Sequence, residues 1–416
     1  MTKENGKPQI RFAKFKDTWE QRKLGEMMEV TSVKRIHQSD WTDSGVRFLR
    51  ARDIVAESKK ENVSEPLFIS QEKYDEYSAV SGKVKKGDLL VTGVGTIGVP
   101  MLINSEEPLY FKDGNIIWFK NENVIDGRFF YYSFNGLNIQ KFIKESAGLG
   151  TVGTYTIENG KKTPINLPPK KDEQAKIGEY FFNLDHLITL HQRKYDKLTK
   201  VKKSMLEKMF PKNGANVPEI RFKGFTDAWE QRKLSEIADK VTEKNAGLQY
   251  IETFTNSAEF GIISQRDFFD HDIAKMSSLG GYYIVRNEDF VYNPRISTSA
   301  PVGPINRNKL GRIGVMSPLY TVFRPHDVDT TYLEYFFKSK YWHSFMNFNG
   351  DSGARLDRFS IKDSVFFEMP IPLPYIEEQR KIGEHLTQLD HLITLHQRKL
   401  EKLKILKKAC LEKMFV

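Results

Sequence analysis

The sequence predicts a mixed α/β (α+β) chain in which two globular domains are separated by two long α-helices that form an antiparallel coiled coil, with pseudo-two-fold symmetry. Three observations lead to this fold class. Two blocks of sequence occur twice along the chain. The longer block carries apolar residues at the spacing of a coiled coil. The stretches between the blocks contain short apolar runs, Gly-rich loops and an aromatic segment, which is typical of mixed domains.

The internal repetition divides the chain into two halves. Residues 8–26, "PQIRFAKFKDTWEQRKLGE", return at 218–236 as "PEIRFKGFTDAWEQRKLSE", with 13 of 19 positions identical. Residues 173–210 return at 378–415 with 26 of 38 positions identical. The repeat distance is roughly 205–210 residues, far longer than the 20–50 residues of a solenoid unit. The chain therefore consists of two half-proteins that share connecting parts and differ in their globular parts, which favours a pseudo-two-fold axis.

The longer repeat predicts the two helices and the residues that pair them. Its apolar positions alternate steps of three and four over about five heptads, and prolines followed by acidic residues precede each copy. Each helix of about 38 residues would be roughly 55 Å long. Lys202 and Lys407 fill one slot of each seam, and His191 and His396 are expected to fix register. The predicted pairing residues are Ile177, Leu184, Ile188, His191 and Leu198, and in the second copy Ile382, Leu389, Ile393, His396 and Leu403.

The stretch "VTGVGTIGVP" at 91–100 contains GxGxxG and raises the question of a dinucleotide or S-adenosylmethionine site. Such a loop needs a helix directly after its glycines, so that helical N–H groups meet the phosphates. Here Pro100 and the β-branched, apolar "VPMLIN" follow, which predicts a second strand. The corresponding loop of the second half, "NPRISTSAPVG", has a single glycine. We interpret both segments as strand-to-strand loops that carry specificity on a common scaffold.

The two variable domains can be aligned by pattern despite their low similarity. "ARDI" at 51–54 matches "QRDF" at 265–268, Thr92 stands against Asn293, and "NIIWFK" at 115–120 matches "LYTVFR" at 319–324. "FFYYSFNGLNIQKFI" at 129–143 matches "YLEYFFKSKYWHSFM" and predicts one aromatic helix that forms each core. "SAGLGTVGTYTI" at 146–157 pairs with "NFNGDSGARLDRFSI" at 347–361.

Composition bounds the class of protein. Of 416 residues, 39% are hydrophobic and 28% charged, an ordinary balance for a soluble protein. No apolar run approaches the ~18 residues of a membrane span, and the N-terminus lacks the apolar segment of a signal peptide. Cys410 is the only cysteine, so we expect neither disulfides nor a thiolate metal site, and a cytoplasmic location. The net charge of +10 is compatible with a polyanionic partner.

The order of these motifs resembles the specificity subunits of type I restriction–modification enzymes. Each half opens with "WEQRKLxE" and closes with "LPPxxxEQxKI" or "PLPxxEEQxKI" before "LDxLITLHQRKxxKL", and the resemblance covers essentially the whole chain. It implies a first target recognition domain at 8–165, a central long helix and linker at 166–217, a second target recognition domain at 218–370 and a C-terminal long helix at 371–416. Each domain would read one half of a bipartite, asymmetric DNA site.

The resemblance also implies the partners. The helices would set the non-specific spacer and dock two modification (methyltransferase) subunits, and one or two restriction (endonuclease/translocase) subunits would join to cleave unmethylated DNA. The chain itself would be non-catalytic and would hold no cofactor; S-adenosylmethionine, ATP and Mg²⁺ would belong to the partners. The residues agree, since "NPRI" at 293–296 fails the (D/N/S)PP(Y/F) methylase motif and there is no GxxxxGK(S/T) loop.

Candidate DNA-binding residues are loop side chains able to reach base edges, with Arg suited to guanine and Asn or Gln to adenine. They are Arg47, Arg50, Arg52, Thr92, Thr96 and Thr154 in the first domain, and Gln265, Arg266, Asn293, Arg295, Ser297, Thr298, Arg355 and Arg358 in the second. Arg52 and Arg266 each precede an aspartate with which an ion pair is an alternative role. Two other functions stay open: an autonomous DNA-modifying enzyme, and a coiled-coil adaptor whose variable domains bind proteins.

Overall fold

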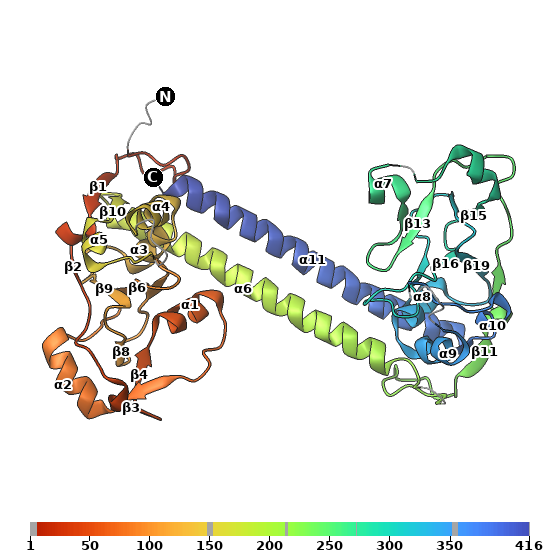
Figure 1. Ribbon diagram of the computed structural model, residues 1–416, viewed down its shortest axis with the longest axis horizontal. Helices are drawn as coiled ribbons and strands as arrows, with labels where there is room; N and C mark the ends of the chain where they lie inside the picture. The colour runs from red at the N-terminus through yellow and green to blue at the C-terminus, as the bar shows by residue number, and fades with distance from the viewer. Residues whose placement is uncertain (1–5, 148–152, 213–214, 272, 352–356, 416) are drawn as a thin grey trace. The chain divides into compact units, whose positions relative to one another are not determined.

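The structure of the chain is a computed structural model that describes residues 6–147, 153–212, 215–271, 273–351 and 357–415. The chain forms two compact units (Figure 1). Unit 1 comprises Met1–Gln192 and Gln397–Val416, and unit 2 comprises Arg193–His396. Both long helices therefore contribute one half to each unit. None of the described helices is long and apolar enough to cross a membrane.

Unit 1 is built on three small sheets. Its central sheet has the antiparallel order β2-β9-β6-β7, a second sheet has the order β3-β5-β4-β8 with β4 and β8 parallel, and β1 pairs with β10. The strands are β1 Glu20–Lys23, β2 Glu29–Thr31, β3 Trp41–Thr42, β4 Val46–Leu49, β5 Leu67–Ile69, β6 Leu89–Thr92, β7 Pro100–Leu102, β8 Leu109–Phe111, β9 Ile116–Lys120 and β10 Pro164–Leu167. The helices before the long one are α1 Ala51–Lys59, α2 Gln71–Ser81, α3 Gly127–Phe134, α4 Leu137–Ser146 and α5 Ile157–Lys162.

Unit 2 repeats the central sheet and divides the rest differently. Its central order is β12-β19-β16-β17 and β11 pairs with β20, but the remaining strands form two separate pairs, β13-β14 and β15-β18. The strands are β11 Glu230–Lys233, β12 Ala238–Lys240, β13 Phe254–Ser257, β14 Gly261–Ser264, β15 Tyr283–Val285, β16 Phe290–Tyr292, β17 Ile305–Arg307, β18 Gly314–Met316, β19 Thr321–Pro325 and β20 Pro370–Leu373. The short helices are α7 Gln265–Phe269, α8 Thr330–Lys338, α9 Tyr341–Asn349 and α10 Asp363–Phe366.

The two predicted long helices are present as α6, Lys171–Lys208, and α11, Ile376–Met414. In each unit, one half of α6 lies alongside one half of α11 (Figure 1). Asp185 pairs with Lys407 at 2.6 Å in unit 1, and Lys202 pairs with Asp390 at 2.5 Å in unit 2. Going from Asp185 to Lys202, the residue number increases along α6, while the partners on α11 decrease from Lys407 to Asp390. The two helices therefore run antiparallel, as predicted. The two lysines of the apolar seam therefore each face an aspartate of the other helix.

Each core forms around the aromatic segment, but the prediction of one helix there was wrong. The segment consists of two short helices in each unit, α3 and α4 in unit 1 and α8 and α9 in unit 2. In unit 1 the break falls at Asn135–Gly136, residues of low helix propensity. The buried rings of Phe129, Phe130 and Phe134 pack against Ile177 and Phe181 of α6. The globular part of unit 1 and α6 consequently share one hydrophobic core.

Candidate nucleic-acid interface

The glycine loop of unit 1 is a tight connection between antiparallel strands. Val91 of β6 stands opposite Pro100 of β7 in the sheet register, so no helix follows the glycines, as predicted. Gly93 is enclosed by backbone, because a Cβ there would lie 2.7 Å from the carbonyl oxygen of Tyr155. The Thr92 hydroxyl donates to Thr96 O at 2.5 Å and accepts from Val99 N at 3.0 Å. Loop closure thus accounts for the glycine pattern.

The candidate arginines of unit 1 differ in their freedom to meet a ligand. Arg47 donates to Leu67 O at 2.9 Å and stacks over the Phe68 ring. Arg50 pairs with buried Asp53 at 3.2 Å and donates to Glu65 O. Arg52 has a side chain 53% exposed and lies 3.7 Å from Asp53, the ion pair anticipated as an alternative. Arg47 and Arg50 therefore hold their own sheet and helix together.

The threonine candidates of unit 1 are placed differently from one another. Thr92 is fully buried and uses its hydroxyl inside the loop, so it supports the loop's shape and does not face a ligand. Thr96 and Thr154 are exposed. Of the six candidates in this unit, Arg52, Thr96 and Thr154 consequently remain in positions from which a base or phosphate can be reached.

In unit 2 the loop between β16 and β17, residues 293–304, lies against the segment 357–361 that precedes α10. Arg295, in the loop between β16 and β17, forms an isolated antiparallel bridge with Arg358, and Ile296 N donates to Asp357 O at 3.1 Å. Gly303 closes the first loop with a φ of +84°, where a Cβ would collide with Asn293 O. Phe359 N also donates to Pro294 O at 2.7 Å, so the two loops meet just beyond Tyr292, the last residue of β16.

The other candidates of unit 2 divide in the same way. Asn293 donates from Nδ2 to Asn256 O at 2.8 Å and accepts from Arg295 N, so it shapes the loop. Gln265 is buried and donates to Phe254 O at 3.3 Å. The exposed candidates are Arg266, Arg295, Ser297, Thr298 and Arg358. Arg355 lies outside the described residues.

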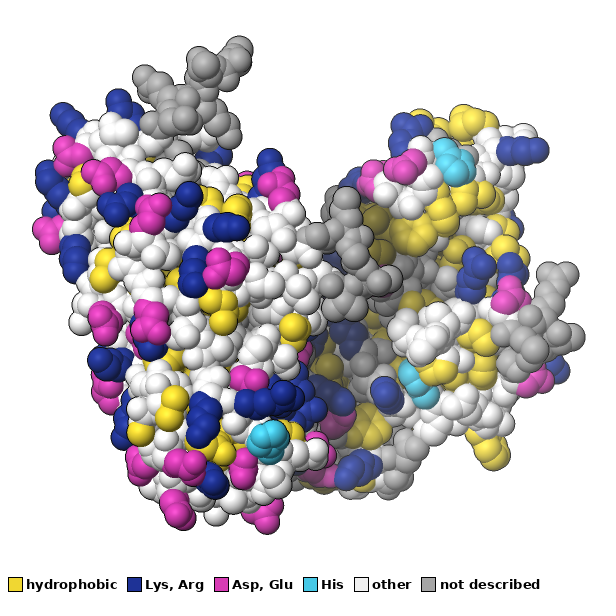
Figure 2. Space-filling view, turned by 60° about the vertical axis from the view of Figure 1, so that its left-hand side comes forward, with side chains coloured by type: hydrophobic (Ala, Val, Ile, Leu, Met, Phe, Trp, Pro, Cys, Tyr) yellow, Lys and Arg dark blue, Asp and Glu magenta, His cyan; other side chains and the backbone are white. Residues whose placement is uncertain are grey.

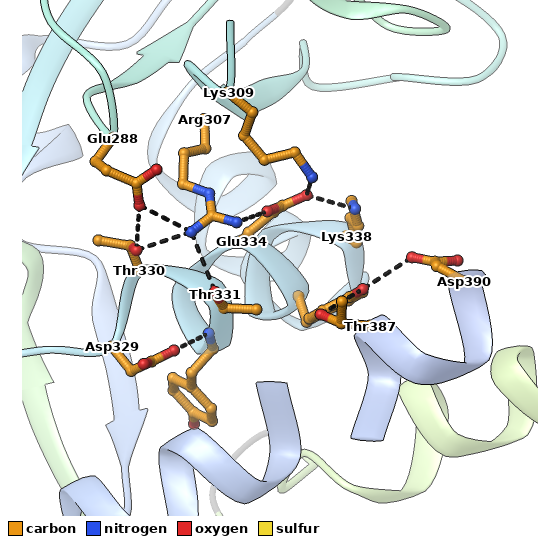
Figure 3. Close-up of polar contacts among 12 residues, drawn as sticks. Glu288, Arg307, Lys309, Asp329, Thr330, Thr331, Glu334, Lys338, Thr387 and Asp390 are labelled. Carbon is orange, nitrogen blue, oxygen red and sulfur yellow. Dashed lines mark hydrogen bonds and ion pairs between the residues drawn. The ribbon is translucent and has the colours of Figure 1, made fainter. Parts of the chain in front are cut away.

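A charged cluster fixes the strand that follows the recognition loop of unit 2 (Figure 3). Arg307 of β17 pairs with Glu334 of α8 at 2.6 Å, and Lys309 and Lys338 reach the same carboxylate at 2.9 and 2.6 Å. Burial by itself would raise the pKa of Glu334, but the ammonium groups of Lys338 and Lys309 outweigh it and lower the pKa to about 2. The cluster holds β17, and with it one end of the loop, against α8.

The next residue of α8 continues this connection to the long helices. Tyr335 donates to Asp390 of α11 at 2.8 Å, and Asp390 pairs with Lys202 of α6. Unit 1 has the equivalent chain, because Tyr132 donates to Asp185 at 2.7 Å and Asp185 pairs with Lys407. These tyrosines were not among the predicted site residues; their identical place in the aligned aromatic segments was the available signal.

The contact between each recognition domain and its long helix is built twice from the repeated residues. Arg11 makes a bidentate pair with Glu173 at 2.6 and 2.8 Å, and Arg221 makes the same pair with Glu378 at 2.7 and 2.8 Å. Both glutamates are buried. The next residue, Gln174 or Gln379, accepts from the backbone N–H of Asp126 or Asp329. We call these equivalent contacts the junction frame. The junction frame was not predicted, although its charged residues are identical in both copies of the repeat.

The predicted helix-pairing residues of α6 and α11 are all buried or half-buried. Ile177 and Leu184 are buried in the core of unit 1, and Ile382 and Leu389 in that of unit 2. Leu403 packs against the core of unit 1 and Leu198 against that of unit 2. The residues nearer the middle of the helices are half-buried: Ile188, His191, Ile393 and His396. The seam therefore packs against recognition-domain cores at its ends.

On the face shown in Figure 2, side chains of both charges are mixed. In the view of Figure 2, Lys and Arg side chains alternate with Asp and Glu across the forward unit and do not form one continuous basic field. Among the described residues there is no cluster of His, Cys, Asp and Glu that could hold a metal ion.

A family model with the description "Type I restriction modification DNA specificity domain" matches the chain twice, at residues 16–200 and 226–405. This chain belongs to that family. Each match begins close to the repeated "WEQRKL" motif and extends into a long helix, so the family's unit of sequence includes one recognition domain and the helix attached to it. The prediction made from the motifs is confirmed, together with the fold class of two mixed domains and paired helices.

Several proteins of this family are similar over large parts of the chain. The MjaVIII specificity subunit of Methanocaldococcus jannaschii is 25% identical and covers 70% of this chain and 69% of its own length. The putative MjaX specificity subunit of the same organism is 22% identical over 98% of this chain and 95% of its own. The crystal structure of the type I S subunit of M. genitalium superposes with a TM-score of 0.56 at 13% identity, covering 98% and 99% of the two chains.

Proposed function

We propose that this chain is the DNA-reading subunit of a type I restriction–modification complex, in which each unit reads one half of a bipartite, asymmetric site. One observation carries the proposal. The junction frame is the same in both units, whereas the loops at the equivalent sheet edge, 93–99 in unit 1 and 293–304 in unit 2, share neither length nor chemistry. A common scaffold with unrelated loops is the arrangement expected of two readers for two different sequences.

The long helices are proposed to set the spacer and to dock two modification subunits. Leu187 and Leu190 are 40% and 39% exposed on α6, and their repeat equivalents Leu392 and Leu395 are 40% and 39% exposed on α11. Apolar side chains exposed at the same places in both repeats support two equivalent docking surfaces. One or two restriction subunits would complete the complex, and S-adenosylmethionine, ATP and Mg²⁺ would be bound by the partners.

The first test is single-molecule sequencing of adenine methylation in cells that express this chain with its modification subunit. A bipartite motif with a fixed gap that disappears without this chain supports the proposal and gives both half-sites. Salt-insensitive DNA binding by the assembled complex, with no such motif, would favour the adaptor, because phosphate contacts make affinity fall steeply with salt. Methylation by the purified single chain would favour the autonomous enzyme.

The spacer function has a separate test. Inserting seven residues at equivalent points of α6 and α11 keeps the seam in register and adds ~10 Å to each helix. The gap should grow by about three base pairs, since B-DNA rises ~3.4 Å per base pair. Insertion in α6 alone is the control, because it puts the two seams out of step and should abolish methylation. A gap that stays the same in the double insertion contradicts the spacer function.

A further inference from the structure

We propose that a pocket at the loop edge of unit 2 holds a base edge of one DNA half-site, with Asp363 accepting from an exocyclic amino group. The inference rests on the proposed function and names residues that read the site. The pocket has a volume of about 450 Å³ and lies where the two variable loops meet the central sheet. That volume is within the ~300–1,000 Å³ of typical ligand pockets.

A set of three polar side chains forms one wall of the pocket. Lys240, at the end of β12, donates to Asp363 Oδ2, and Thr321, at the start of β19, lies 3.2 Å from Asp363 Oδ1. The Lys240 and Asp363 side chains are 37% and 46% exposed, so both can meet a ligand. A carboxylate has about four lone-pair positions, and these two contacts leave acceptor capacity on Asp363.

The same three positions are apolar in unit 1. The sheet registers and the aligned repeats place Val30 against Lys240, Ile117 against Thr321, and Ile157 against Asp363. Val30 and Ile117 are 4% and 3% exposed, and Ile157 packs against the same core. These three equivalent positions are therefore part of the hydrophobic core in unit 1 and form an open polar wall in unit 2. The junction frame needs neither arrangement, since it is complete in both units.

One residue explains why the pocket stays open. Gly160 of α5 allows that helix to close onto Val30 and Ile117, because its ideal Cβ position is only 3.0 Å from Val30 Cγ1. Phe366 of α10 stands at the equivalent place and is stacked on Tyr292 with ring centroids 5.0 Å apart. A phenylalanine ring where unit 1 has no side chain keeps α10 from approaching the sheet in the same way.

The chemistry of the lining favours a base over a phosphate. Lys240 is neutralised by Asp363, and a phosphate would be repelled by that carboxylate. A base edge offers both donors and acceptors, which suits a lysine–aspartate pair, and acidic side chains accept from the amino group of cytosine or adenine. Arg358 lines the opposite side among the recognition loops, and the rings of Tyr283 and Tyr320 provide flat apolar surface. The site therefore selects a base that carries an amino group.

The test uses the full chain co-expressed with its modification subunit, read by single-molecule sequencing. Asp363→Asn keeps the shape but adds a donor, and it should relax selection at one position of one half-site by roughly tenfold while the other half-site stays unchanged. Lys240→Met should affect the same half-site. Glu368→Gln is the matched control, because it removes another exposed lysine–carboxylate pair of unit 2, with Lys233 at 2.6 Å, outside the pocket.

Each outcome has one meaning. Relaxation confined to one position supports the proposal. An unchanged motif in both pocket variants overturns it, as does an equal loss of methylation at all sequences, which is the pattern expected of a phosphate contact. If the unaltered chain itself directs no bipartite motif, the proposed function fails before the pocket is tested.

Discussion

The two units build the same junction frame and differ in how the recognition part is supported above it. In unit 1, α1 packs over the central sheet and Ile54 is 1% exposed. In unit 2 the aligned helix α7 has only five residues, and Phe268, which takes the place of Ile54, is 39% exposed. Unit 2 instead fixes the strand after its loop through the charged cluster around Glu334. The same junction frame therefore supports two quite different globular parts.

The largest effect is expected from breaking the junction frame. Arg11→Ala or Arg221→Ala leaves a buried glutamate without its cation, which costs about 3–5 kcal/mol of local stability. Arg221→Ala should cost more, because Glu173 keeps a hydrogen bond from Trp19 Nε1 at 3.3 Å, whereas Trp229 Nε1 is buried with no partner among the described residues. Hydrogen exchange of the paired strands β1 and β10, and of the paired strands β11 and β20, measures the local stability of each unit separately. Lys170→Met, which removes an exposed pair with Asp17, is the control.

The next largest difference between the units is expected in their stability at low pH. The pKa of Glu334 is lowered to about 2 from 4.5, so its contribution is fully present above pH 4.5 and is lost as the pH falls toward 2. The loss is on the order of 3 kcal/mol and falls on unit 2, since Tyr131 occupies the aligned place in unit 1. Hydrogen exchange of β17 and α8 between pH 4.5 and 2 checks this, and Glu334→Gln should flatten the dependence. Equal acid sensitivity of α3 would contradict it.

A third contrast concerns the glycines where each long helix meets its recognition domain. A Cβ on Gly178 would lie 2.8 Å from Phe129 N and from Arg128 Cβ, while one on Gly383 would lie 3.1 Å from Thr331 Cγ2. Gly178→Ala should destabilise unit 1 by about 1–3 kcal/mol through overpacking. Gly383→Ala should cost less, because its Cβ would meet its nearest atom at 3.1 Å, so that the gain of about 1 kcal/mol in helix propensity, which both positions share, offsets more of the strain. Thermal unfolding of the two variants gives the order, and the reverse order would show that the junctions relax differently.

The smallest effect should be the same in both units. Lys407→Met and Lys202→Met each remove one half-exposed ion pair with an aspartate of the other helix. Each loss is expected to be about 0.5–1 kcal/mol and to shrink at high salt. A chemical denaturation series at two salt concentrations measures both. A large difference between the variants would show that the repeated helices do not pack equivalently.

The site was only partly predictable from the sequence. The glycine loop was correctly predicted as a strand-to-strand connection, because strand patterns and glycines are local signals, and the rejection of a nucleotide site followed from the residues after Gly98. The accessibility of individual side chains was not predictable. Thr92 and Gln265 are buried, and Arg47 and Arg50 are held by their own unit, through contacts decided by chain packing. Lys240 and Asp363, 123 residues apart, could be joined only by the fold.

The sequence by itself determined the duplicated order, the two long helices, their antiparallel seam and the family. Repeated blocks and heptad periodicity can be recognised from the order of the residues without knowing which distant residues touch. The tertiary structure decided which repeated charges form the junction frame, since Arg11 and Glu173 are 162 residues apart. It also decided that one set of equivalent positions is core in unit 1 and pocket wall in unit 2. That outcome depends on whether a glycine or a phenylalanine separates a short helix from the sheet, a steric condition that no local pattern contains.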